Sequence, residues 1–103
     1  MKNILLVCAA GMSTSMLVKK MREHAESVNI PANISALAIS EAKEKITKNA
    51  VDVVLLGPQV RFQKNEIEAI AQGKIPVAVI DMKSYGQMDG KAVIEQAFQL
   101  LNQ

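Results

Sequence analysis

The sequence predicts an α/β fold in which a four-stranded parallel sheet, in strand order 2-1-3-4, carries helices on both faces. The first observation is that short apolar runs alternate with segments of helical spacing along all 103 residues. The second is that Gly, Pro and Asn punctuate the joins between these segments. Strict alternation of this kind produces parallel strands joined by right-handed crossovers. We therefore expect one Rossmann-like, three-layer domain over residues 1–103.

The composition favours one well-filled core and argues against several classes of function. Half of the residues are hydrophobic, only 3% are aromatic, and the formal charge is +2. A chain with no basic patch and few stacking aromatic residues is not expected to bind nucleic acid. One cysteine excludes an internal disulfide, and with one histidine it leaves no convincing metal site. Without a signal peptide, an apolar membrane-spanning window or an extra apolar helix stripe, we expect a cytoplasmic monomer that does not insert into the membrane.

The first half of the chain is expected to form two strands and two helices. In chain order, these are a strand at 3–8, a helix at 14–28, a strand at 33–38 and a helix at 41–48. One face of the first helix is apolar and includes Val28. The strand at 33–38 alternates apolar and polar residues as a partly exposed edge strand does. Ser40 is the expected N-cap of the short helix after it.

The second half repeats the pattern. We expect a strand at 51–56, a helix at 60–72, a strand at 76–80, a loop at 81–90 and a last helix at 90–102. The strand at 51–56 is nearly all apolar, so it should be central and covered on both faces. Phe62 belongs to the apolar set of the helix at 60–72, and Gly73 fits its C-cap. Asp81 is interpreted as a turn residue and Asp89 as the N-cap of the last helix.

Cys8 is the residue that says most about function, because it ends the first apolar strand and a loop of small and hydroxyl residues follows it. In open parallel sheets, ligands bind beyond the carboxyl ends of the strands. Backbone N–H groups at a helix start attract anions and favour the reactive thiolate. We interpret Cys8 as a nucleophile that accepts a phosphoryl group. The alternative is a core thiol packed like a small hydrophobic residue.

The segment after Cys8 is the expected phosphate-binding loop. Its N–H groups can curl around a phosphate, Gly11 permits a tight turn, and the hydroxyl groups can donate further hydrogen bonds. Ser13 or Thr14 could instead serve only as an N-cap. The phosphate-binding candidates are Ala9, Ala10, Gly11, Met12, Ser13, Thr14 and Ser15.

The spacing is similar to the loop architecture of the low-molecular-weight tyrosine phosphatases. Those enzymes have a cysteine, five residues, an arginine and a serine on a similar sheet. Here Thr14 stands at the arginine position and Ser15 matches the serine. Those enzymes also use the aspartate of an Asp-Pro pair as general acid and then as base, and this sequence contains no Asp-Pro pair. Without the arginine and this aspartate, hydrolysis should be slow, so a phosphoryl carrier is favoured over the alternative of a phosphatase-like hydrolase. A receiver domain needs an aspartate at the end of its third strand. Here the third strand ends at Leu56 and Asp52 stands at its start, so a receiver domain is disfavoured.

Three blocks of the sequence resemble enzyme IIB of the lactose/cellobiose branch of the bacterial sugar phosphotransferase system. They are CAAGMSTSMLV at 8–18, DVVLLGPQV at 52–60 and YGQMDG at 85–90. The resemblance covers the chain in order and is greatest to the chitobiose/cellobiose type. Ala9 is a departure, because serine is common at that position, but the backbone cradle does not depend on it.

The resemblance implies a place in sugar uptake. A phosphohistidine of the partner IIA would phosphorylate Cys8. The phosphocysteine would then pass the group to a β-disaccharide, such as chitobiose, cellobiose or lactose, bound by the membrane component IIC. This is the activity of a protein-N-phosphohistidine–sugar phosphotransferase, and it implies no metal or organic cofactor. The residues that we expect to contact the partners are Met12, Met16, Gln59 and Tyr85.

Overall fold

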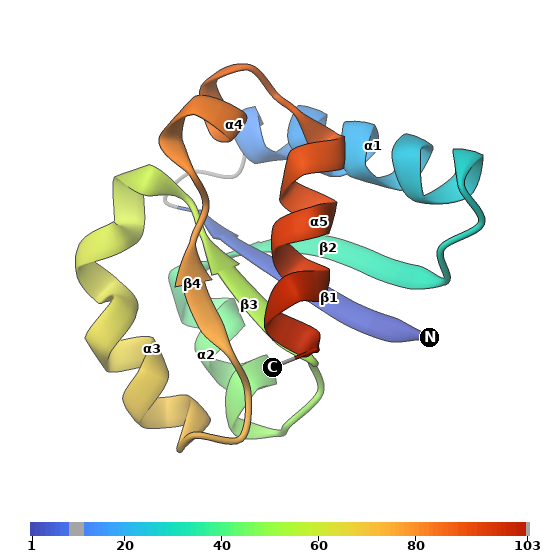
Figure 1. Ribbon diagram of the computed structural model, residues 1–103. Coiled ribbons are helices and arrows are strands. Elements are labelled where there is room, and N and C mark those ends of the chain that lie inside the picture. Colours follow the sequence, from blue (N-terminus) through green and yellow to red (C-terminus); the bar gives the residue numbers. More distant parts are fainter. Residues whose placement is uncertain (9–11, 103) are drawn as a thin grey trace.

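The structure, a computed structural model, describes residues 1–8 and 12–102. Four parallel strands form one sheet in the order β2-β1-β3-β4, which confirms the predicted architecture (Figure 1). The strands are β1 (Lys2–Cys8), β2 (Ala32–Ala38), β3 (Val53–Leu56) and β4 (Val77–Val79). As predicted, β2 lies at an edge of the sheet and β3 lies inside it.

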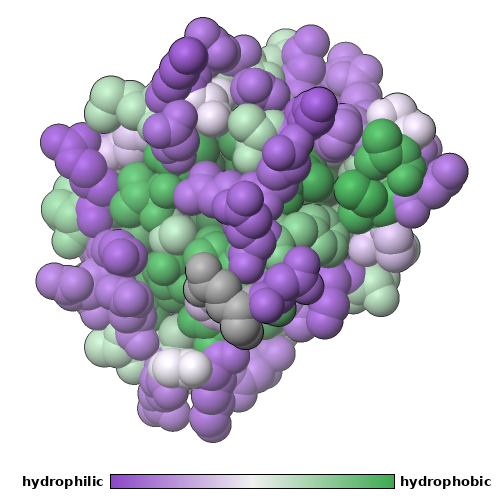
Figure 2. Space-filling view, viewed as in Figure 1, coloured by the Kyte–Doolittle hydropathy of each residue, from purple (hydrophilic) through white to green (hydrophobic). Residues whose placement is uncertain are grey.

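Helices cover both faces of the sheet and produce three layers. α1 (Met12–Ser27) and α5 (Gly90–Leu101) pack on one face. α2 (Ile39–Thr47) and α3 (Lys64–Ala71) pack on the other face, where a 3-10 helix, η1 (Pro58–Gln63), leads into α3. A short helix, α4 (Met82–Gly86), follows β4. In Figure 2 hydrophilic residues cover the outer side of α5, as expected for a helix with one face in solvent.

The central strands carry the core because each of them is buried on both faces. Ile4 and Leu6 of β1 pack under α1 and α5, while Leu5 and Val7 pack against α2 and α3, and none of the four exposes more than 1% of its surface. Successive side chains of a strand point to opposite faces of the sheet. An apolar run without alternation is therefore what a doubly covered strand requires.

Both open edges of the sheet receive side-chain hydrogen bonds from a neighbouring helix. The Arg22 guanidinium on α1 donates to the carbonyl oxygen of Ile34 on β2, with 3.1 Å between Nε and O. The Gln96 amide on α5 donates to the carbonyl oxygen of Val79 on β4 over 2.9 Å. Unpaired edge carbonyls invite another strand, so these donors occupy groups that could otherwise pair with a second chain.

Helix α1 crosses helix α5 at Gly90, the first residue of α5. A Cβ atom at this position would lie 2.5 Å from the Lys20 carbonyl carbon and 2.7 Å from the Met21 backbone nitrogen. Such distances are inside van der Waals contact with backbone atoms. The absence of a side chain at Gly90 is therefore what allows the two helices to approach.

Several predicted helix boundaries were wrong. The segment predicted as a helix at 60–72 begins as η1, whose backbone at Val60 is not helical (φ −118°, ψ 19°), and Val60 is buried in place of Phe62. Phe62 exposes 76% of its surface, so its assignment to the core was wrong. Gln72, in the left-handed region at φ 54°, is the C-cap of α3, and Gly73 follows it.

Other differences concern the caps and the loops. Ser40 does not cap α2, because that helix already begins at Ile39 and its N-cap is Ala38. Val28, predicted on the apolar face of the first helix, lies after the end of α1 and is 49% exposed. The predicted loop at 81–90 contains α4, whose N-cap Asp81 accepts a hydrogen bond from the Ser84 backbone N–H.

Candidate functional site

The carboxyl ends of the strands lie at one edge of the sheet, and we refer to this edge as the carboxyl edge. Figure 1 shows that the start of α1 and the whole of α4 gather there. The connection from β3 passes there too, since the Gly57 N–H donates to the Val7 carbonyl oxygen over 2.8 Å. This hydrogen bond ties the exit of β3 to the residue directly before Cys8.

Cys8 is the last residue of β1, and its position at the carboxyl edge agrees with the sequence prediction. It is 3% exposed, and its Sγ lies 3.8 Å from the carbonyl oxygen of Leu37 on β2, to which the thiol can donate a weak hydrogen bond. Strand alternation puts Cys8 on the same face as Leu6, the face that α1 covers. The thiol is thus near the start of α1, although its burial also fits a core thiol.

The predicted phosphate loop lies partly outside the described residues. Ala9, Ala10 and Gly11 are not described, so their expected roles stay predictions. Met12, Ser13 and Thr14 form the first turn of α1 in the backbone, and their side chains also lie outside the described part. Ser15 and Met16 follow in the same helix, and both are exposed. Because α1 begins at Met12, a helix N-terminus starts only four residues after the cysteine.

Two of the predicted partner contacts meet at Gly57. A Cβ atom there would lie 3.3 Å from Gln59 Oε1, 3.4 Å from the Val7 carbonyl oxygen and 3.7 Å from Tyr85 Cε2. Gln59 is exposed and Tyr85 is half-buried against the core. The structure therefore brings Gln59 and Tyr85 together beside the end of β1, from elements that are far apart in the sequence.

Exposed apolar side chains occur on three elements that lead away from the carboxyl edge. Met16 on α1 is 46% exposed, Phe62 on η1 is 76% exposed and Met82 on α4 is 64% exposed. Sequence reasoning found Met16 but missed the other two. Asp81 and Ser84, with their cap spacing, could have indicated a helix with Met82 in its first turn. No local signal indicated that Phe62 would face outward.

Two aspartates at this edge cap helices, and His24 and Asp52 lie away from it. Asp89 caps α5 by accepting a hydrogen bond from the Ala92 N–H at 3.1 Å, as predicted, and Asp81 caps α4. His24 lies in the last turn of α1, far along the helix from Cys8. Asp52 accepts a hydrogen bond from the Asn3 N–H at 2.7 Å at the opposite edge. The hydrogen bonds of Asp81 and Asp89 thus assign both carboxylates to helix caps.

A cavity of about 600 Å³ lies at the amino ends of the strands, between Asp52, Lys74 and Leu101, far from the cysteine. Within residues 1–8 and 12–102, no three His, Cys, Asp or Glu side chains are grouped so that they could hold a metal ion. In the same part of the chain, every helix is too short or too polar to cross a membrane.

Comparisons with known proteins identify the family. A family model described as the lactose/cellobiose-specific IIB subunit of the PTS system matches residues 3–96. The PTS system oligo-beta-mannoside-specific EIIB component of Bacillus subtilis (strain 168) is 50% identical over 102 residues, which cover 98% of this chain and 97% of that protein. The galactose-specific EIIB component of Lactococcus lactis subsp. cremoris (strain MG1363) is 40% identical over 105 residues, with the same two coverages.

A solved structure agrees in both fold and sequence. The solution structure of the cellobiose-specific phosphotransferase IIB component protein from Borrelia burgdorferi has a TM-score of 0.80 at 46% identity. The similarity covers 98% of this chain and 92% of that one. This chain therefore belongs to the lactose/cellobiose-specific IIB subunit family of the phosphotransferase system.

Proposed function

We propose that the protein is a phosphoryl carrier in which Cys8 takes a phosphoryl group from a phosphohistidine of IIA and gives it to a sugar held by the membrane component IIC. The observation that carries the proposal is the position of Cys8 at the end of a central strand, on the face from which α1 begins. An anion at that position would receive N–H groups of the helix N-terminus. Family membership adds the phosphotransferase context.

The chemistry consists of two displacements at phosphorus. In the first, the Cys8 thiolate attacks, an S–P bond forms, the P–N bond to the histidine breaks, and the imidazole nitrogen leaves with the electron pair. In the second, a sugar hydroxyl attacks, an O–P bond forms, the S–P bond breaks, and the thiolate is regenerated. In the proposal, the hydroxyl proton passes to a base on the transporter, and Asp81 and Asp89 keep their roles as helix caps.

Loading changes the hydrogen bonding of the sulfur. The free thiol can donate to the Leu37 carbonyl oxygen, whereas a phosphocysteine has no S–H to donate. The loaded sulfur therefore loses this contact with β2, and the phosphoryl oxygens require donors instead. In the proposal, residues 9–15 supply them through backbone N–H groups and the hydroxyls of Ser13, Thr14 and Ser15.

The partners are proposed to dock over the carboxyl edge, where Met12, Met16, Gln59 and Tyr85 would contact them. Exposed Met16 and the pair formed by Gln59 and Tyr85 beside Gly57 support this assignment. Methionine side chains adapt to differently shaped surfaces, which suits one site that serves two partners in turn. We propose that the chain acts as a cytoplasmic monomer and associates with the membrane only through IIC.

The proposed sugar is a β-linked disaccharide of the chitobiose, cellobiose or lactose type. The relatives differ in their named sugars, which are oligo-beta-mannoside and galactose, and the solved structure is named for cellobiose. Because IIC holds the sugar, the carrier needs to meet only the acceptor hydroxyl. A broad choice of sugars among relatives of one carrier fold is the expected consequence.

Labelling through a phosphoenolpyruvate-driven relay tests the proposal. The protein is incubated with radiolabelled phosphoenolpyruvate, the general relay proteins and IIA, and the label is followed by gel electrophoresis. We expect stoichiometric labelling of the wild type, loss of at least about 99% of the label in Cys8→Ser, and release of the label by iodine, as an S–P bond requires. Ser35→Ala, which keeps the cysteine, is the control and should be labelled normally.

Two results would contradict the proposal. Label that persists in Cys8→Ser would assign the phosphoryl group to another residue. Rapid hydrolysis of an aryl phosphate by the protein alone would instead favour the phosphatase-like alternative. That hydrolysis is expected to be slow, because Thr14 replaces the arginine that stabilises the transferring group in such enzymes.

A further inference from the structure

We propose that Phe62, with Arg61 and Lys64 beside it, is the docking anchor for the phosphohistidine donor, a protein whose contact surface is apolar and acidic. The inference rests on the proposed function, since a donor is needed only if Cys8 is loaded. It goes further by assigning one segment, residues 61–64, to one of the two partners. We call this segment the donor anchor.

Phe62 differs from the other aromatic side chains of the chain. Tyr85 and Phe98 pack against the core, whereas Phe62 is 76% exposed on η1. An exposed aromatic ring gains free energy when a partner buries it, and aromatic residues are frequent hot spots of protein interfaces. The 3-10 geometry that turns Val60 inward leaves Phe62 on the outer side. Phe62 thus has the exposure that an anchoring residue needs.

The position of the donor anchor makes it accessible to a protein that reaches Cys8. η1 begins directly after Gly57, whose N–H is bonded to the Val7 carbonyl oxygen, one residue before the cysteine. Exposed Met16 and Met82 lie on the elements that follow β1 and β4 at the same edge. A partner that covers the end of β1 therefore lies over the start of η1.

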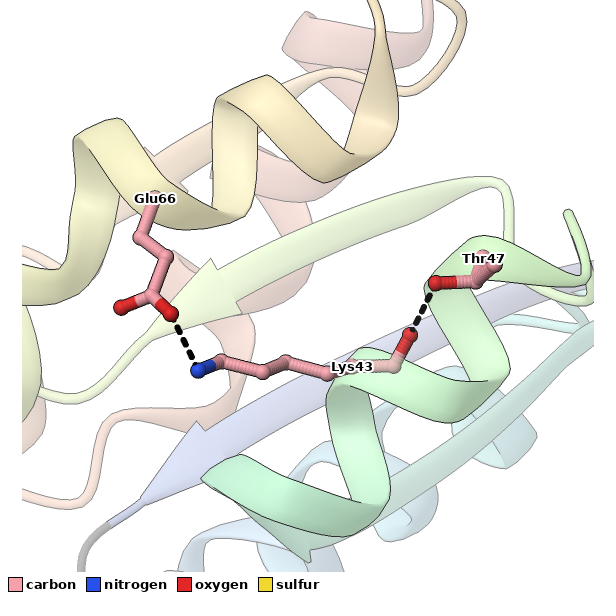
Figure 3. A network of polar contacts seen from close by, with 3 residues as sticks. All are labelled: Lys43, Thr47 and Glu66. Carbon is pink, nitrogen blue, oxygen red and sulfur yellow. Dashed lines mark hydrogen bonds and ion pairs between the residues drawn. The ribbon is translucent and has the colours of Figure 1, made fainter.

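The charge around Phe62 selects the chemistry of the partner. Residues 58–64 contain Arg61 and Lys64 and no acidic residue. The nearest acidic side chain along α3, Glu66, is engaged by Lys43 of α2, as Figure 3 shows. Among residues 1–8 and 12–102, neither Arg61 nor Lys64 forms an ion pair, and Arg61 Nη1 donates to the Pro58 carbonyl oxygen over 3.2 Å. Two cations thus lie within two residues of the exposed ring, and among the described residues neither is neutralised by an ion pair.

This arrangement favours the donor over the transporter. The donor arrives with a phosphoryl dianion on its histidine and leaves without it, so attraction to Arg61 and Lys64 is strongest before transfer and weaker afterwards. The transporter brings a sugar hydroxyl, which carries no charge. Cations at the rim therefore speed the approach of the loaded donor and permit its release once Cys8 holds the group.

Single-turnover kinetics with Phe62→Ala tests the role of the Phe62 ring in docking the donor. Because Phe62 is exposed, the variant should keep the wild-type unfolding midpoint in urea. We expect the second-order rate constant for transfer from phosphorylated IIA to Cys8 to fall by about tenfold or more. Phe62→Leu should restore part of the rate, and Val28→Ala, which truncates an exposed apolar residue away from the carboxyl edge, should react as the wild type does.

The second step, transfer from Cys8 to the sugar, tests whether Phe62 serves the donor and not the transporter. Phe62→Ala is loaded to completion with excess phosphorylated IIA and then mixed with membrane vesicles that contain IIC and the sugar. The rate of this second step should equal that of the wild type. A wild-type rate of loading, or an equal loss in both steps, would overturn the assignment. If Cys8 is not labelled in any variant, the proposed function itself fails, which is a different result.

The charges are tested by Arg61→Gln combined with Lys64→Gln. The double variant should load more slowly at low salt, and its rate should depend less on ionic strength than the wild-type rate, because two attractive charges are gone. Lys74→Gln, which removes an exposed lysine at the amino ends of the strands, is the matched control and should retain the wild-type salt dependence. An unchanged salt dependence in the double variant would overturn the role of the cations.

Discussion

At the scale of single residues, Gly90 sets the distance between α1 and α5. The backbone of Lys20 and Met21 occupies the space that a Cβ atom would need. Neighbouring backbone cannot swing aside as a side-chain end can, so the helices themselves would have to separate. This close approach gives the second glycine of the YGQMDG block a packing role that is independent of the cysteine.

Gly90→Ala should therefore destabilise the protein by about 1–3 kcal/mol, as overpacking does. Urea unfolding followed by circular dichroism measures the free energy of unfolding. Gly86→Ala is the control, because a Cβ atom at Gly86 would have no neighbour within 4 Å. It should change the stability by less than about 1 kcal/mol. Similar stabilities for the two variants would contradict the packing argument.

At the scale of elements, short polar caps define where the last two helices begin. The Asp89 carboxylate accepts from the Ala92 N–H at 3.1 Å, and the Asp81 carboxylate accepts from the Ser84 N–H at the same distance. Each cap satisfies a backbone donor that the first helical turn leaves without a partner. α5 packs against the core through Val93, Ile94 and Ala97, so its starting point also positions that apolar face.

Removing the cap tests this role. Asp89→Ala should lower the free energy of unfolding by about 1 kcal/mol, because the Ala92 N–H loses its acceptor. Asp89→Asn keeps a side-chain oxygen at the same place and should remain within about 0.5 kcal/mol of the wild type. Thermal and urea unfolding of the three proteins give the comparison. Equal losses in both variants would show that the negative charge matters more than the hydrogen bond.

The sheet and the long helices could be predicted because their signals are local. A doubly buried strand such as β3 is an apolar run, and an amphipathic helix such as α5 repeats its apolar residues every three to four positions. The segment from Pro58 to Ala71 could not be predicted in the same way. It changes from 3-10 to α geometry at Lys64, so the apolar residues do not follow one period, and Phe62 was placed on the wrong side. α4, at five residues, is too short to produce a period.

The candidate site, like the fold, could be predicted only where its signals are local. Parallel strands end at one edge, so Cys8, Gln59 and Tyr85 could be assigned to it from strand order and spacing alone. The contact of Gly57 with Val7, and hence the position of η1 beside the cysteine, depends on the register of β1 against β3. No local pattern encodes that register. The assignment of residues 9–15 to phosphate binding stays a prediction.

At the scale of the whole molecule, each edge strand of the sheet receives a side-chain hydrogen bond at one carbonyl oxygen. Arg22 occupies the Ile34 carbonyl oxygen on β2, and Gln96 occupies the Val79 carbonyl oxygen on β4. The two helices that carry these donors, α1 and α5, lie on the same face of the sheet (Figure 1). The helices of one layer thus cover a face of the sheet and also donate hydrogen bonds to both of its edge strands.

Replacing the amide tests the protection of the β4 edge. Gln96→Met keeps the length of the side chain but cannot donate, so the free energy of unfolding should fall by about 0.5–1.5 kcal/mol. Gln99→Met, on the exposed side of the same helix, is the control and should have little effect on stability. Sedimentation velocity should also detect more self-association in Gln96→Met than in Gln99→Met. The reverse order would contradict the proposed protection.

The half-buried ring of Tyr85 beside Gly57 has a practical consequence. The chain contains one tyrosine and no tryptophan, so this ring is its main ultraviolet fluorophore. Its emission therefore originates next to the exit of β1 and β3, where partners are proposed to bind. An optical titration of the unlabelled wild type with IIA should follow complex formation directly, provided that the partner is itself free of tryptophan or its signal is subtracted.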